Sequence, residues 1–211
     1  MNEEQTILEF FSQTENLSLA LAVAERMDAI RERMNNQLWQ QVQLRIDELL
    51  AGQNINWHVR LTEDRNVAGR FVGLHYRSTD EQQICLLPML EQQFMGSEWR
   101  IYSGLMWSAT PSTAHIQLPA ITHLQSSLQQ AGYKSNENFL CWQWTPYYPR
   151  RRSFLLSYSQ KPAELLGEIA KIAGSLLIDY GSQILHANKA LGKIAPSLPA
   201  ALQQMRGELL G

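Results

Sequence analysis

The segment TPYYPRRRS, residues 145–153, brings together side chains suited to binding an anion or an acidic surface. Two tyrosines stand between two prolines, and three consecutive arginines follow. Arginine offers paired donors that match phosphate and carboxylate oxygens, and tyrosine offers rigid contact area. This pattern favours a contact to a phosphate, as in nucleic acid, or to an acidic protein, and the alternative is a solvated hairpin tip. The predicted binding residues are Tyr147, Tyr148, Arg150, Arg151 and Arg152.

Other residue types lack the spacing that common chemistries require. The five histidines are scattered, without an HxH or HExxH motif. Cys85 and Cys141 lie in apolar runs without a CxxC motif, which predicts buried thiols in a reducing compartment and no zinc site. The motifs GxxxxGK[ST] and GxSxG are absent, which excludes a P-loop and an α/β-hydrolase nucleophile. We therefore expect no metal site and no cofactor.

The composition is that of a globular protein with a sizeable core. Of 211 residues, 45% are apolar, and the formal net charge is −2, so any basic patch for nucleic acid must be local. The N-terminus, MNEEQTILEFF, begins acidic and lacks the order of a signal peptide, and no run reaches the ~18 apolar residues of a membrane span. We expect a single cytoplasmic domain over residues 1–211, without membrane contact.

The elements that must position the binding residues begin with helices. Residues 3–13 predict a short helix, and residues 16–51 predict a long one, with apolar side chains every three or four positions and no glycine or proline inside. At 1.5 Å per residue the long helix would extend ~50 Å, more than a small domain is wide. Part of it must contact other helices or a second subunit. We predict a homo-oligomer, a dimer in the simplest case.

The hydrophobic period then changes from helical to strand-like. Residues 53–160 predict a sheet with one crossover helix at 119–132, and residues 161–211 predict further helices, ending with a short one after Pro199. The expected fold class is α+β (α/β-like), with a mixed sheet of about six strands flanked by long N- and C-terminal helices that pack together. The predicted strands are 56–63, 69–77, 83–91, 98–108, 138–145 and 153–159.

Two patterns in these elements predict packing. Gly167, Gly174 and Gly181 recur every seven residues on nearly one helix face, where another helix could approach closely. Alternation places Trp142 and Trp144 on one face of the strand that contains Leu140. Two tryptophans on a sheet face are typical of a core beneath a helix, and a base-stacking platform is the alternative.

Five segments, which extend over most of the chain, carry a family resemblance. They are NNQLWQQVQLRIDELL, VGLHYR, YSGLMW, NENFLCWQW and KPAELLGEIAKIAGSLLIDYGSQILHANKAL. In them the chain resembles bacterial proteins of the PD-(D/E)XK nuclease superfamily, whose core has the order helix, strand meander, crossover helix and strand. The resemblance implies a nuclease-like core in a phage-defence or mobile-element context.

The catalytic signature of that family does not carry over. It places Asp on one strand and Glu-x-Lys on the next, so that carboxylates hold Mg²⁺ while the lysine steadies the attacking water. Here the strand where Glu-x-Lys would be sought, predicted at 83–91, reads CLLPMLEQQ, and all five lysines lie outside the first four strands. The missing lysine, the overlong helix and the glycine row favour a non-catalytic interaction module that binds a protein or nucleic acid. The alternative is a Mg²⁺-dependent nuclease with a rearranged site built from Glu63, Asp64 and Glu91.

Overall fold

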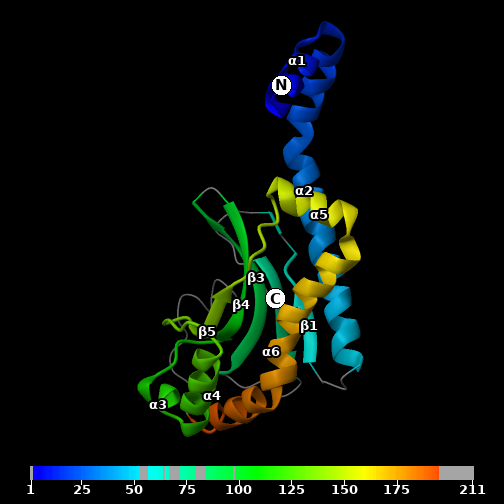
Figure 1. The fold of residues 1–211 in the computed structure, drawn as a ribbon. Helices are drawn as coiled ribbons and strands as arrows, with labels where there is room; N and C mark the ends of the chain where they lie inside the picture. The colour runs from blue at the N-terminus through cyan, green and yellow to red at the C-terminus, as the bar shows by residue number, and fades with distance from the viewer. Residues whose placement is uncertain are drawn as a thin grey trace.

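The computed structural model describes residues 2–52, 57–63, 65–66, 72–78, 84–96 and 98–194. Within them the chain forms an α+β fold with six helices and a five-stranded sheet (Figure 1). The predicted helices at 3–13, 16–51, 119–132 and 162–191 are confirmed. The elements are α1 (Glu3–Ser12), α2 (Thr14–Gly52), β1 (Trp57–Leu61), β2 (Val72–Ser78), β3 (Leu86–Met95), β4 (Glu98–Trp107), α3 (Thr113–Ile116), α4 (Pro119–Gln130), β5 (Phe139–Trp144), α5 (Arg152–Gln160) and α6 (Pro162–Leu191).

The sheet is antiparallel throughout, and its strand order β1-β2-β3-β4-β5 follows the chain. The α+β class is confirmed, but the prediction of a mixed sheet of about six strands is wrong for the described residues. The connection through α3 and α4 returns β5 to the edge of β4 in the antiparallel sense, so it makes no parallel crossover.

The short helix expected after Pro199 lies outside the described residues. No described helix combines the length and apolar composition needed to cross a bilayer.

The main core lies between one face of the sheet and the helices α2, α4 and α6. Leu74 and Tyr76 of β2 are fully buried in it, as is Trp39 of α2. Burying a large apolar side chain contributes about 1.5–3 kcal/mol, so this layer supplies most of the driving force for folding. One buried amide of this layer is fully paired: Asn188 of α6 accepts from the backbone N–H of Leu86 at 2.7 Å and donates to its carbonyl at 3.1 Å.

The opposite face of the sheet carries a second, smaller cluster that contains strand residues and no helix residues. Trp142 and Trp144 are half-buried there, so the prediction that they lie beneath a helix is wrong. A register shift in the β4–β5 pairing pairs Leu105 with Cys141 and Met106 with Phe139, which leaves Leu140 as an extra residue. Leu140 therefore turns to the helix-covered core, away from the two tryptophans.

The predicted strand at 153–159 is the helix α5. Phe154, Leu156 and Tyr158 fit a period of two, but the buried pair is Phe154 and Tyr158, four residues apart, while Leu156 is exposed. The Tyr158 hydroxyl also donates to Gln41 Oε1 of α2 at 2.9 Å, which fixes the helix against the long N-terminal one. Residues 145–151 therefore connect a strand to a helix and are not a hairpin tip.

The long helices α2 and α6 pack against each other, as predicted. The contact is closest at Gly174, where an added Cβ would lie 2.6 Å from Leu49 Cδ2. Cβ atoms added at Gly167 or Gly181 would meet nothing within 4 Å. The prediction that the glycine row faces another helix is correct at Gly174 and wrong at the other two positions.

Candidate functional site

The loop 145–151 leaves the edge strand β5 and crosses to α5, and backbone contacts to β4 hold its first half. Thr145 donates to the carbonyl of Ile101 from its N–H at 2.9 Å and from its hydroxyl at 2.8 Å. The N–H of Ile101 in turn donates to the carbonyl of Tyr147 at 3.0 Å. Because Pro146 has no N–H and a restricted φ, the chain leaves the sheet in a defined direction. The two tyrosines that follow are therefore held in fixed positions.

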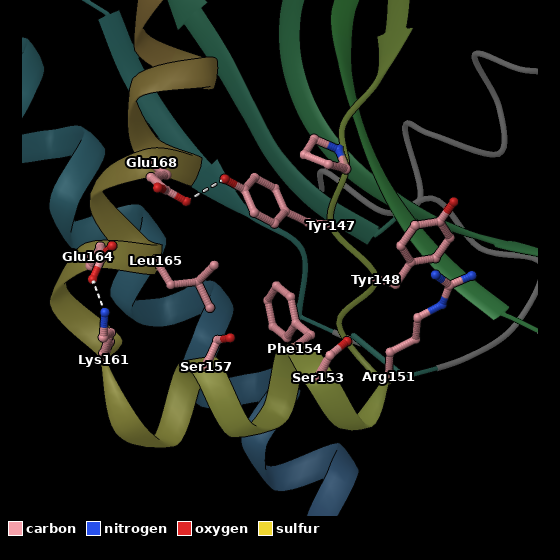
Figure 2. Close-up of a pocket in the computed structure, with 11 residues that line it drawn as sticks. Tyr147, Tyr148, Arg151, Ser153, Phe154, Ser157, Lys161, Glu164, Leu165 and Glu168 are labelled. Atoms are coloured by element: carbon pink, nitrogen blue, oxygen red, sulfur yellow. Dashed lines mark hydrogen bonds and ion pairs between the residues drawn. The ribbon is translucent and has the colours of Figure 1, made fainter.

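Tyr147 points into a pocket between the loop, α5 and the start of α6 (Figure 2). Its hydroxyl donates to Glu168 Oε2 at 2.7 Å, and its ring meets the Phe154 ring edge-on at 6.2 Å. Burial, and then the Glu168 carboxylate, raise the pKa of Tyr147 to about 12. The phenol therefore keeps its proton at neutral pH, and it acts there as a hydrogen-bond donor and not as a base or nucleophile.

This pocket has a volume of about 380 Å³ and carries charges of both signs on its walls. Lys161 Nζ lies 3.3 Å from Glu164 Oε2, and Glu168 is held by Tyr147, so the acidic groups already have partners (Figure 2). Its other polar groups include the hydroxyl side chains of Ser153 and Ser157. These features suit contact with a polar side chain of a partner, and they offer no activated nucleophile.

Tyr148 lies close to two guanidinium groups. Arg151 lies over its ring at 3.6 Å and Arg100 at 5.1 Å. Arg151 also donates through Nε and Nη2 to the two carboxylate oxygens of Glu98. Hydrogen bonding to Arg151 lowers the pKa of Glu98 below its ordinary value. Arg151 is thus stacked and paired within the chain itself.

Arg152 diverges from Arg150 and Arg151, so the three consecutive arginines do not form one positive patch. Arg150 lies over the Trp99 ring at 5.0 Å and donates to Asn66 Oδ1 at 3.2 Å. Arg152 begins α5, its side chain is 78% exposed, and its Nη2 lies 3.4 Å from Glu3 Oε1. The divergence follows from the turn into α5, because consecutive residues at a helix start point in different directions.

The carboxylates of the nuclease alternative occupy different environments. Glu63 is exposed just after β1, whereas Glu91 is fully buried on β3, and Asp64 lies outside the described residues. Glu91 Oε1 lies 2.6 Å from His75 Nε2, and Glu91 Oε2 accepts from the Tyr102 hydroxyl. Among the described residues, no group of three or more His, Cys, Asp or Glu side chains is placed to hold a metal ion.

The glutamine after Glu91 has a role in packing. Gln92 is buried on the helix-covered face, where Trp39 Nε1 donates to its Oε1 at 2.9 Å. Its Nε2 donates to the carbonyl of Arg65 at 2.9 Å.

Cys141 is buried as predicted, and burial raises its thiol pKa to about 12, so it is unreactive at neutral pH. Cys85 is half-buried, and no disulfide joins the two cysteines.

The N-terminal helices form a projection, here called the helical arm, residues 3–30. Figure 1 shows α1 folded back along the first half of α2, well away from the sheet. No residue of α1 is buried, and the buried residues of α2 begin at Asn35. The turn between the helices is specific, since Asn16 Nδ2 donates to the carbonyl of Phe10 at 3.0 Å. The large exposed apolar side chains of the arm are Ile7, Leu8, Phe10, Phe11, Leu17, Leu19, Leu21, Val23 and Ile30.

The middle of the arm, NLSLALAVA at residues 16–24, has no charged residue. Leu17 and Leu21 lie on one side of the helix, and Leu19 and Val23 lie on the opposite side, because two residues span about 200°. All four side chains are 43–60% exposed. A helix that is apolar on opposite sides is normally enclosed by neighbours, and here α1 is one neighbour.

Comparison of the chain with protein-family models, with curated proteins and with solved structures found no match. The interpretation of both sites therefore depends on their own geometry. Sequence reasoning identified the tyrosines and arginines of the loop but missed Glu98, Trp99 and Glu168, which are their partners. Each of these lies at least 17 residues away from the loop in the sequence, and no local pattern marks it.

Proposed function

We propose that the protein is a non-catalytic interaction module that assembles with a second copy of itself through the helical arm. The observation that carries the proposal is the arm's exposed apolar surface, on opposite sides of α2, at a distance from the core. Exposed apolar surface on this scale marks an interaction site. The degenerate nuclease-like core is the part of this proposal that depends on the sequence resemblance alone.

A second copy is the occupant that best fits the arm. Two α1–α2 hairpins supply four helices, which enclose apolar residues in the manner of a four-helix bundle. Segment 16–24 carries no charge, so pairing of two copies there brings no like charges together. A two-fold axis places this segment of one copy against the same segment of the other.

The environment of Glu91 supports a non-catalytic core over the nuclease alternative. A carboxylate that holds Mg²⁺ needs oxygens open to the ion and further oxygen ligands beside it. Both oxygens of Glu91 already contact protein groups, and the residue is fully enclosed. Glu63, the described carboxylate that would join it, is exposed beyond the end of β1.

Sedimentation velocity across micromolar concentrations tests the assembly. We expect the parent chain to sediment at twice its monomer mass and Leu21→Glu to dissociate. Each copy loses one buried leucine, at about 1.5 kcal/mol or more per copy, so the dissociation constant should rise about 100-fold or more. Leu44→Glu is the matched control, because Leu44 lies on the same helix, is 62% exposed and stands outside the arm.

Leu21→Glu should fold as the parent does, since Leu21 is exposed in the single chain. Far-ultraviolet circular dichroism of both variants checks this. A parent chain that stays monomeric over the whole range would contradict assembly with a second copy. Equal weakening by Leu21→Glu and Leu44→Glu would contradict the assignment of the interface to the arm.

A further inference from the structure

A second pocket, here called the arginine pocket, lies between α2, the β3–β4 hairpin and the loop 145–151. Its volume is about 310 Å³, at the small end of the range for small-molecule sites. Three of its residues carry guanidinium groups and one carries a carboxylate, so its walls have an excess of two positive charges in a chain of net charge −2. The pocket is lined by Arg31, Phe94, Glu98, Trp99, Arg150 and Arg151.

The positive charges of this pocket are unequally compensated. Arg151 is paired with Glu98. Arg31 has one contact at 3.2 Å, to Asp28, whose side chain is 83% exposed, and such solvent-exposed pairs hold little energy. Arg150 forms no ion pair with a described carboxylate, and its hydrogen-bond partner is the neutral amide of Asn66.

Two donors of the pocket are buried without a partner. The Nε atoms of Arg31 and of Arg150 are enclosed, and neither has a hydrogen-bond acceptor. A buried donor on a charged group costs free energy unless an acceptor reaches it. The two guanidinium groups belong to different elements, Arg31 to α2 and Arg150 to the loop 145–151. They line the same cavity. An anion in this cavity would lie beside both guanidinium groups and would supply the missing negative charge.

We propose that the arginine pocket binds a phosphomonoester whose other part is aromatic. Phosphate oxygens match the paired N–H groups of guanidinium, and a dianion offsets the two excess charges. The aromatic part of the ligand would contact the Phe94 side chain, which lines the pocket and is 41% exposed. The ring centre of Phe94 lies 5.7 Å from that of Trp99. The other ring of that wall, Trp99, is already covered by Arg150.

A compact ligand fits this site better than a nucleic-acid strand. A strand requires a line of basic side chains along its backbone. Here Arg152 diverges from the pocket towards Glu3, and the nearby arm has six acidic residues against one arginine over residues 3–30. These charges repel an extended polyanion but leave a small cavity accessible.

Isothermal titration calorimetry of the full chain with phenyl phosphate tests the proposal, with inorganic phosphate as the comparison ligand. We expect saturable one-site binding, tighter for phenyl phosphate than for inorganic phosphate. Arg150→Gln should weaken it about tenfold or more, since a hydrogen bond to a charged group contributes about 1.5–3 kcal/mol. Arg31→Gln should do the same from a different element. Arg152→Gln, the matched control outside the pocket, should leave the affinity unchanged.

Several results would overturn the proposal. Absence of saturable binding of phenyl phosphate by the parent chain is one. Equal affinity in Arg150→Gln, Arg31→Gln and Arg152→Gln, with circular dichroism showing all three folded, is another. Binding of a single-stranded oligonucleotide that needs Arg152 as much as Arg150, without phenyl phosphate binding, would replace the pocket by a nucleic-acid surface. Arg150→Gln should sediment as the parent does, because Arg150 lies outside the arm. A loss of phosphate binding can therefore be distinguished from a loss of arm assembly.

Discussion

The contact between Gly174 of α6 and Leu49 of α2 allows a sharp test of how the two long helices pack. A Cβ at position 174 would come within 2.6 Å of Leu49 Cδ2 and within 3.5 Å of Leu49 Cδ1. Gly167 lies seven residues earlier on the same helix, is exposed, and has no atom within 4 Å of an added Cβ. The same substitution, glycine to leucine, therefore meets a packed interface at one position and open space at the other.

The two variants should change stability in opposite directions. Replacing glycine in a helix interior by a good helix former gains about 0.5–1 kcal/mol, and this is the whole effect expected for Gly167→Leu. At Gly174 the same gain is opposed by overpacking, which typically costs about 1–3 kcal/mol and occasionally more. Leucine adds four carbons where the first already overlaps the end of the Leu49 side chain, which can rotate to relieve part of the overlap. With an overpacking cost of about 2 kcal/mol and a helix gain of about 0.5–1 kcal/mol, we expect Gly174→Leu to lose about 1–1.5 kcal/mol net.

Urea unfolding followed by circular dichroism measures both changes, provided that the slope of the transition stays the same. Gly174→Leu should unfold at lower urea than the parent, and Gly167→Leu at slightly higher urea. Adding Leu49→Ala to Gly174→Leu should recover part of the loss, because it removes the methyl groups that collide. If Gly174→Leu is as stable as Gly167→Leu, the close approach of α2 and α6 at this position is wrong.

Two further predictions concern the metal and the buried phenol. Titration of the parent chain with Mg²⁺ or Mn²⁺ should give no site-specific heat, because both Glu91 oxygens are engaged by protein groups; a saturable heat that Glu91→Gln abolishes would favour the nuclease alternative instead. The pKa of Tyr147 is raised from 10.0 to about 12, so the unfolded phenol loses its proton at lower pH than the folded one. Stability should be unaffected by this group below pH 10 and should fall between pH 10 and about 12. Tyr147→Phe should show a smaller fall over that interval in urea unfolding at several pH values, and an equal fall in both proteins would refute the assignment.

The sequence by itself determined α1, α2, α4 and α6 and most of the sheet. The boundaries of α6 and the length of α2 follow from apolar side chains at three- and four-residue spacing, with proline at the start of α6 and glycine just after it. Strands β1 to β5 follow from alternation between polar turns. These signals are local, because each depends on residues that are close in the chain. They also placed Tyr147 and the three arginines together on one loop.

Only the tertiary structure decided what those loop residues do. Whether 153–159 is a strand or a helix depended on which side chains are buried, and that required Gln41 and the surface of α6 to be in place. The hydrogen bonds of Arg150 and Arg151 are made to residues distant in sequence. Glu98 is 53 residues from Arg151, and Asn66 is 84 residues from Arg150. A hydrogen bond or an ion pair depends on distance in space, which the order of residues specifies only after the whole chain has folded.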